Sequence, residues 1–275
     1  MAEADEKPSS LSAGDLLVSM IGDAASAVLQ DDSLSVRNVH DTRTAIRRLR
    51  AYLRTFRPLL DLPWLTGLSA ELQWYQQSLA PIRDLDVIYK WLDAAKDLAD
   101  YVDDASAIDA MQDILKGQRN KARHVFIEAR SSARGIELLN KLDLLSHEVP
   151  LGARASNSVK VFLPLVRKAR RELQDAERIM ADSPGRSHIH EARIKAKSLR
   201  YACEALTPHL GRSVAKIGAD AKGIQDRLGG ILDNVIACEW LEQNASTDPS
   251  VAFSAGKLWV VGMQRWEAAR SRLGN

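Results

Sequence analysis

The 275-residue sequence contains few cysteines and no long apolar run. Cys203 and Cys238 lack metal-ligand spacing and are too few to staple a fold of this size, so we expect two buried, reduced thiols. No segment approaches the roughly 18 consecutive apolar residues of a membrane span, which predicts no membrane association. The first ten residues, MAEADEKPSS, are acidic and polar rather than a secretory signal, so a cytoplasmic protein is expected.

Recognisable catalytic motifs are also missing. The sequence shows no Ser-His-Asp or Cys-His arrangement, no glycine loop of the kind that holds phosphate, and no metal motif. Asp84, Asp86 and Asp233 could suggest a metal site, but no histidine lies near them at ligand spacing. Helix capping or pairing with arginine explains these carboxylates better. The sequence therefore predicts a protein that is not an enzyme and has no cofactor or metal.

The prolines and glycines mostly separate long segments with helical periodicity, and no segment sustains a period of two. An all-α fold is therefore predicted. The expected helices cover residues 12–30, 36–60, 66–100, 103–145 (with a break), 158–182, 186–208, 212–245 and 250–272. Residues 1–11 are predicted to be a disordered tail.

Charge is strongly segregated although the formal net charge is only +2. Residues 37–57 hold seven arginines and one acid, whereas residues 58–118 hold eleven acids and four bases. Residues 160–200 return to eleven bases and five acids. Such a chain can present a strongly positive face while it remains nearly neutral overall.

One segment of the sequence occurs twice, 150 residues apart. VHDTRTAIRRLR begins at Val39, and IHEARIKAKSLR begins at Ile189. A weaker match follows at an offset of 149, with LAPIRD from Leu79 and LGGILD from Leu228. Two matches in the same order indicate an internal duplication. We predict two pseudo-symmetric four-helix bundles, residues 12–149 and 158–275, joined by the loop-like stretch 150–158.

Cations recur along one side of each repeated helix. At about 100° per residue, those of the first copy fall within an arc of about 100°, next to an apolar arc. We name them the first ladder and the second ladder. The first ladder is His40, Arg43, Arg47, Arg50, Arg54 and Arg57, and the second is His190, Arg193, Lys197 and Arg200.

A ladder of like charges destabilises its own helix by a few tenths of a kcal/mol per pair. Solvation, or pairing with the acids of residues 84–113, would explain one such ladder, but not the same residue types at the same angles twice. Arginine binds phosphate oxygens through a planar fork and stays charged at physiological pH. The ladders therefore predict a polyanion site, with histidines that become protonated on binding. Arg48, Arg123 and Tyr201 are secondary candidates, as is Arg57.

The chain resembles the CHAD domain family, the conserved histidine α-helical domain. The resemblance rests on VHDTRTAIRRLR, IHEARIKAKSLRY, LAPIRDLDV and QDRLGGILDNV, and it covers nearly the whole chain after about residue 12. It implies two four-helix bundles related by a pseudo-twofold axis, a basic surface between them, binding of inorganic polyphosphate, and association with polyphosphate granules. By resemblance, the site comprises His40, Arg43, Arg47, Arg50, His190, Arg193, Lys197 and Arg200.

Two positions depart from the family pattern. Ser198 is opposite Arg48 in the repeat, and Glu204 is opposite Arg54. The second half should therefore contribute less positive charge, and we expect an asymmetric grip on the ligand. The alternatives left open are a nucleic-acid-binding module, a polyphosphate- or triphosphate-hydrolysing enzyme, and an adaptor that recruits partners through its acidic faces.

Overall fold

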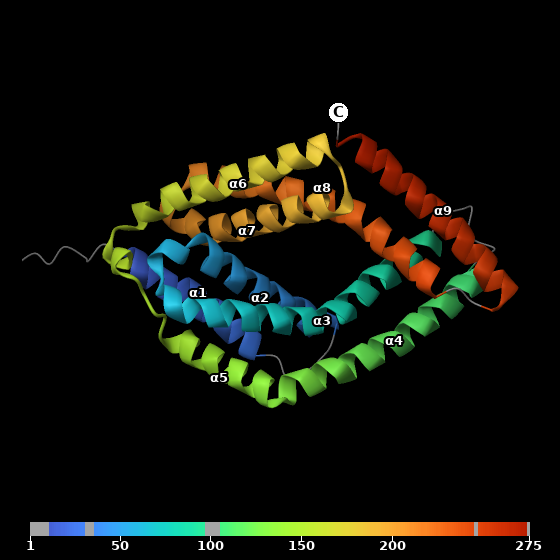
Figure 1. Ribbon diagram of the computed structural model, residues 1–275, viewed down its shortest axis with the longest axis horizontal. Coiled ribbons are helices and arrows are strands. Elements are labelled where there is room, and N and C mark those ends of the chain that lie inside the picture. Colours follow the sequence, from blue (N-terminus) through green and yellow to red (C-terminus); the bar gives the residue numbers. More distant parts are fainter. Residues whose placement is uncertain (1–10, 31–35, 97–104, 245–246, 274–275) are drawn as a thin grey trace, which may run out of the picture.

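A computed structural model describes residues 11–30, 36–96, 105–244 and 247–273 (Figure 1). Almost all of the predicted disordered tail lies outside these residues. Within them the chain forms helices and no β-strand, which confirms the all-α prediction. The helices are α1 (Ala13–Leu29), α2 (Val36–Thr55), α3 (Leu62–Lys96), α4 (Ala105–Ser131), α5 (Ala133–His147), α6 (Phe162–Asp182), α7 (Arg186–Leu210), α8 (Arg212–Gln243) and α9 (Pro249–Ser271).

Local sequence signals set several helix ends. Ser12 and Asp15 form a capping box at the start of α1. The break expected within residues 103–145 lies at Ser132, whose hydroxyl accepts from the Gly135 amide at 3.1 Å and caps α5. At the far end of α7, Gly211 takes a φ of 75°, which glycine adopts without strain.

Two long helices connect the ends of the molecule. Helices α3 and α8 pack against α2 and α7 at one end, and they continue to the other end, where they meet α4 and α9 (Figure 1). Helix α3 bends on the way, and Pro81 within it removes one helical hydrogen bond. Helices α2 and α7 lie against each other and run in the same direction. The two repeated segments are therefore neighbours in the fold.

Both repeated helices bury the apolar arc that the sequence predicted. Leu49 of α2 and Phe56, which directly follows α2, are inaccessible to solvent, as are Ala196 and Leu206 of α7. Each buried leucine or phenylalanine contributes roughly 1.5–3 kcal/mol relative to an exposed one. This burial fixes the rotation of each helix about its axis, so the adjacent cationic arc of α2 faces α7.

The hydrophobic core extends across both predicted halves of the chain. Its largest cluster combines side chains of α1, α2, α3 and α5 with others from α6, α7 and the beginning of α8. A second cluster joins the C-terminal parts of α3 and α8 to α4 and α9. The division into residues 12–149 and 158–275 remains a prediction. Side chains from both ranges contribute to the largest cluster.

Helix starts recur at the spacing of the sequence repeat. Helix α2 begins at Val36 and α7 at Arg186, while α3 begins at Leu62 and α8 at Arg212. Both pairs are 150 residues apart. A duplication would leave this pattern, and the duplication remains a prediction. None of the helices in the described ranges is long and apolar enough to cross a membrane.

Candidate polyanion-binding site

A cleft of about 430 Å³ lies between α2 and α7, and α3 and α8 complete its walls. We call it the basic cleft. Seven arginine and lysine side chains line it, together with one histidine and only two carboxylates, Asp84 and Glu239. The cationic residues are Arg43, Arg47, Arg50, Arg54, Arg186, His190, Arg193 and Lys197.

The structure brings most of the predicted site residues into this one cleft. From the first ladder these are Arg43, Arg47, Arg50 and Arg54, and from the second His190, Arg193 and Lys197, with Tyr201 beside them. His40, Arg48, Arg57, Arg123 and Arg200 are not among the residues that line it. Arg57 lies beyond the end of α2, in the short 3-10 helix Arg57–Leu59, where Pro58 follows. Arg123 lies on α4.

Neutral oxygens hold the arginines of the first ladder. Arg43 Nη1 donates to the carbonyl oxygens of Leu79 and Ala80, at 3.2 and 3.1 Å. Arg47 Nε donates to the Arg43 carbonyl at 3.1 Å, and Arg50 Nη1 donates to Gln76 Oε1 at 2.9 Å. These bonds fix the guanidinium groups without neutralising them. Their charge therefore remains available to a ligand.

The second ladder uses the matching segment of α8 differently. Gly229 is the counterpart of Ala80, and a Cβ atom there would lie 3.2 Å from Arg193 Nη2. Arg193 therefore lies against the backbone of α8, as its counterpart Arg43 lies against that of α3. The weak LAPIRD and LGGILD match thus marks the helix surface on which an arginine rests in each half.

Two donors in these arginines are buried without an acceptor. Within the described residues, Arg43 Nε and Arg193 Nε have no hydrogen-bond partner. A buried, unpaired donor costs roughly 1–3 kcal/mol. Both belong to equivalent positions of the two ladders, so the same deficit occurs twice. An anion with several oxygen atoms could relieve it.

Burial and neighbouring cations lower the pKa values of two cations in the cleft. Burial, and then Arg47, lower the pKa of Arg43 to about 10. For Lys197, burial and then Arg193, Arg47 and Arg43 lower the pKa to about 6. The ammonium form of Lys197 is therefore disfavoured in the empty cleft. A bound anion would reverse that preference.

Both predicted histidines have lowered pKa values for the same physical reasons. Burial is the main cause for each; Arg83 and Arg47 follow for His40, and Lys197 and Arg193 follow for His190. The neutral imidazole is therefore the resting form near neutral pH. His190 lines the basic cleft, whereas His40 lies exposed beside it.

Sequence reasoning missed Arg83 as a site residue. Its charge contributes to lowering the pKa of Arg43, Arg47, Arg193 and His40, which places it within their electrostatic reach. The repeat gave no signal, because the counterpart of Arg83 is Leu232. Its only sequence cue is the Arg-Asp pair that begins at position 83.

Of the aspartates expected to pair with arginine or cap a helix, Asp86 pairs with Arg119 at 2.7 Å. Asp84 and Asp233 lie within electrostatic reach of the cleft arginines. Asp84 lies within α3 rather than at a helix cap and lines the cleft. Burial raises its pKa and Arg43 opposes that rise. Asp233 of α8 has the same raised pKa, opposed first by Arg193. Each ladder thus has one half-buried carboxylate on the adjoining helix, too few to balance its charge.

Tyr201 of α7 contacts arginines of both α2 and α7 at one side of the cleft. It is only 3% exposed, and its ring lies under two guanidinium groups, that of Arg200 at 4.6 Å and that of Arg48 at 5.7 Å. These cation–π contacts stabilise charge without an acid. Arg48 and Arg200 therefore adjoin the cleft through Tyr201.

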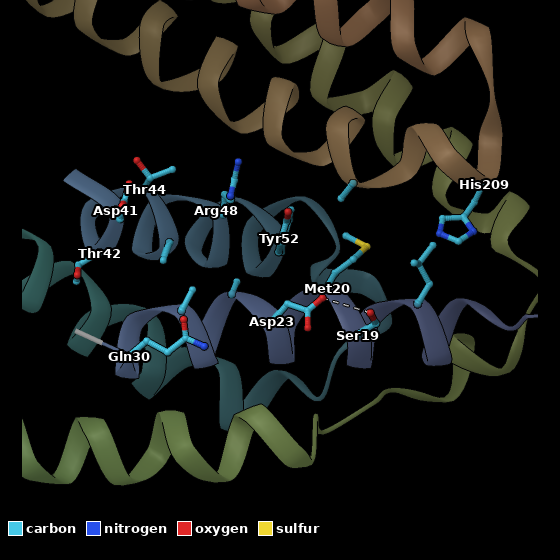
Figure 2. Close-up of a pocket in the computed structure, with 15 residues that line it drawn as sticks. Ser19, Met20, Asp23, Gln30, Asp41, Thr42, Thr44, Arg48, Tyr52 and His209 are labelled. Carbon is cyan, nitrogen blue, oxygen red and sulfur yellow. Dashed lines mark hydrogen bonds between the residues drawn. The ribbon is translucent and has the colours of Figure 1, made fainter. Parts of the chain in front are cut away.

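A larger cavity, about 640 Å³, lies between α1, α2 and the end of α7 (Figure 2). Asp23 and Asp41 balance Arg48 and His209 among its lining residues, and alanines form much of its surface. Figure 2 shows Asp23 on α1, hydrogen-bonded by Ser19, while Arg48 extends from α2 on the side away from α1. This cavity has no surplus of positive charge. The smaller basic cleft is therefore the candidate site.

Comparison with known proteins identifies the class of protein. The CHAD domain family model matches residues 15–242, and the chain belongs to this family. Its fold is similar to that of PptA from Streptomyces chartreusis, with 25% sequence identity and a TM-score of 0.72, over 96% of this chain and 98% of that one. The CHAD domain from the plant Ricinus communis gives 20% identity and a TM-score of 0.71, over 99% and 95% of the two chains. No curated protein matches.

In the part of the chain that the structure describes, no three His, Cys, Asp or Glu residues are grouped closely enough to hold a metal ion. Cys203 and Cys238 are both buried and unpaired, in agreement with the expectation from their number and spacing. Burial raises the pKa of the Cys203 thiol to about 12 and that of the Cys238 thiol to about 11. Neither thiol is therefore activated as a nucleophile.

Proposed function

We propose that the protein binds inorganic polyphosphate in the basic cleft and does not catalyse its turnover. The observation that carries this proposal is that seven arginine and lysine side chains line one cleft together with two carboxylates. Arg43 to Arg54 span about 17 Å along α2 at 1.5 Å per residue. A chain of repeating phosphates can follow such a row and receive donors from both ladders. The CHAD family is linked to polyphosphate, which supports this ligand.

Nucleic acid is the competing polyanion. Proteins that bind single strands combine cations with exposed aromatic platforms on which bases stack. Tyr201 is the one aromatic side chain among the cleft-lining residues, and both its burial and its two arginine contacts remove it from such a role. A ligand without bases fits this surface better.

The test is calorimetric titration with long-chain polyphosphate over a series of salt concentrations. The variant Arg47→Ala/Lys197→Ala removes one cation from each ladder. Its matched control, Arg170→Ala/Arg171→Ala, removes two exposed cations from α6. We expect binding that weakens steeply with salt, a loss of at least about tenfold in the cleft variant, and little change in the control.

Equal losses in both variants would show a diffuse electrostatic attraction and overturn the proposal. Competition with single- and double-stranded nucleic acid in the same titration tests the rival ligand, and stronger binding of either would favour it. Release of inorganic phosphate in the presence of Mg²⁺ would contradict the non-catalytic part. Failure of polyphosphate to bind, combined with recovery of a partner from cells, would favour an adaptor.

Binding of this kind would bring a cytoplasmic protein to polyphosphate granules. A fluorescent fusion in a granule-forming cell tests this consequence, with the Arg47→Ala/Lys197→Ala variant as the control. We expect granular fluorescence for the unmodified chain and diffuse fluorescence for the variant. Granular fluorescence of both would show that a surface other than the basic cleft directs localisation.

A further inference from the structure

Lys197 differs from the other cations of the basic cleft. It lies at the point where the ladders face each other, with no hydrogen bond or ion pair to any described residue. Guanidinium groups of α2 and α7 surround it, while Asp233 of α8 and Asp84 of α3 are the carboxylates nearby. The charged and titratable groups that face it are Arg43, Arg47, His190, Arg193, Asp84 and Asp233.

This setting makes Lys197 a neutral amine at physiological pH. Burial and the three arginines lower its pKa to about 6, whereas an ordinary lysine has a pKa of about 10.4. At pH 7.5 the free-base fraction of an ordinary lysine is therefore only about one in a thousand. Lys197, in contrast, is mostly the free base, which is the nucleophilic form of an amine.

Lys195, two residues away on the same helix, provides an internal contrast. Its Nζ lies 3.4 Å from Glu172 Oε2 and 3.6 Å from Glu191 Oε1. Lys195 thus forms ion pairs with two carboxylates, and it is absent from the lining of the cleft. One helix therefore presents a lysine paired with carboxylates on one side and a lysine surrounded by arginines on the other.

We propose that Lys197 is an acylation site for small acyl phosphates, which the arginines of the basic cleft bind by the phosphate group. The proposal rests on the anion-binding role proposed above. Arg43, Arg47 and Arg193 supply the donors for the phosphate oxygens, including the buried Nε atoms of Arg43 and Arg193. A carbonyl carbon attached to that phosphate lies within reach of the Lys197 amine in the same cleft.

The reaction balances without a further reactant. Lys197 Nζ attacks the carbonyl carbon and forms an N–C bond, after which the bond between that carbon and the bridging oxygen breaks. Inorganic phosphate leaves with the electron pair, and the surplus proton of the amine passes to the phosphate or to water. The arginines stabilise the negative charge that develops on the leaving phosphate. The product is an amide at Lys197.

Acylation would also change polyphosphate binding. A bound polyanion favours the protonated form of Lys197 and so acquires an additional cation. The amide cannot accept that proton, and its acyl group occupies part of the cleft. Modification at this position would therefore weaken polyphosphate binding and make it responsive to the supply of acyl phosphates.

The experiment uses the full chain, acetyl phosphate as the probe, and peptide mass spectrometry to follow acetylation of Lys197 and Lys195 from pH 6 to 10. At pH 7.5 we expect Lys197 to react about tenfold faster than Lys195. Its free-base fraction is much larger than that of an ordinary lysine, and its lower intrinsic nucleophilicity offsets only part of this advantage. Its rate should level off above about pH 7. Arg47→Gln should slow the reaction with acetyl phosphate.

A second reagent separates docking from amine reactivity. p-Nitrophenyl acetate lacks a phosphate group, so Arg47→Gln should slow its reaction with Lys197 much less than that of acetyl phosphate. Equal rates at Lys197 and Lys195, or a Lys197 rate that climbs through pH 10, would overturn the proposal. So would equal effects of Arg47→Gln on both reagents.

Tripolyphosphate distinguishes this inference from the proposed function. Selective protection of Lys197 by tripolyphosphate would support both. Preferential acetylation of Lys197 without such protection would contradict polyphosphate binding in the cleft and leave the acylation site standing. Protection of Lys197 by tripolyphosphate without preferential acetylation would support the cleft as a polyphosphate site and contradict the acylation.

Discussion

Helices α2 and α7 carry equivalent ladders, but the neighbouring side chains hold them differently. Arg50 donates to Gln76 at 2.9 Å. At the matching positions of the second half, Arg200 Nε lies 3.1 Å from Glu204 Oε1 without a hydrogen bond, and the buried Gln225 Oε1 has no partner among the described residues. The residue that differs is Glu204, the counterpart of Arg54. One carboxylate thus diverts an arginine from the glutamine that its counterpart uses.

A further asymmetry lies on the supporting helices. Arg83 of α3 adds a cation near the first ladder, while its counterpart Leu232 adds none. The second ladder also contains Lys197 where the first has Arg47, and a lysine can lose its charge in this environment whereas an arginine retains it. The first half therefore provides permanent charge. The second provides charge that depends on pH and on the ligand.

The largest expected effect comes from exchanging the residues that make the halves unequal. Arg54→Glu places a carboxylate at the cleft and should weaken polyphosphate binding about tenfold or more, because it removes an attraction and adds a repulsion. Glu204→Arg should strengthen binding by up to about tenfold and release Arg200 towards Gln225. Calorimetry at fixed salt measures both changes. Similar affinities for the two variants would show that the asymmetry has no functional consequence.

Lys197→Met should raise the free energy of unfolding but weaken polyphosphate binding. The folded-state pKa of about 6 lies below the unfolded value of 10.5. Between these values the native state binds fewer protons than the unfolded state, so the lysine lowers stability as pH falls towards 6. The variant should be more stable than the unmodified chain at pH 7, by about 1–3 kcal/mol after allowance for solvent access. It should also bind polyphosphate several-fold more weakly.

Denaturant unfolding at pH 6, 7 and 9 checks the stability change, whose magnitude should be largest at pH 6. Arg47→Met is the comparison from the first ladder. Because arginine retains its proton over this range, its effect on stability should change little with pH. If both variants respond to pH in the same way, the distinction between permanent and titratable charge is wrong.

Histidine protonation should produce a smaller effect. A bound polyanion raises the pKa of both imidazoles, which burial and neighbouring cations lower in the free protein. Affinity should therefore rise as pH falls from about 8 to 6. We expect His190→Gln to reduce this rise about threefold and His40→Gln to reduce it less, because His190 lines the cleft. Titrations at several pH values measure it, and a Lys197→Gln background removes the lysine's contribution.

The sequence predicted the helices well because they depend on local information. Apolar spacing at the helical period set the buried faces of α2 and α7, and caps such as Ser12 and Asp248 set helix starts. The prediction for Arg57 was less successful, since Pro58 ends the regular helix before the ladder can include it. Proline has no backbone N–H and clashes with the preceding turn, so it ends the helix even where the helical periodicity of the side chains continues.

Contacts between distant segments could not be predicted in this way. Arg83 joins the site because the bent α3 brings it towards both ladders, and no periodic pattern in its own helix marks it. The pairing of Arg43 with the carbonyl of Ala80 likewise depends on how two helices pack. The repeated LAPIRD and LGGILD segments indicated that these positions matter, but only the fold shows that they support arginines.

The smallest effect concerns the surface on which Arg193 rests. Gly229→Ala would place a Cβ atom 3.2 Å from Arg193 Nη2, while Gly230→Ala meets nothing within 4 Å. Both changes favour the helix by up to about 1 kcal/mol, so they should raise stability similarly. Arg193 can move only slightly in its buried position, and we expect Gly229→Ala alone to weaken polyphosphate binding, by about twofold. Equal affinity of the two variants would mean that Arg193 keeps its contacts after moving, and that the small residue at 229 reflects helix packing rather than the site.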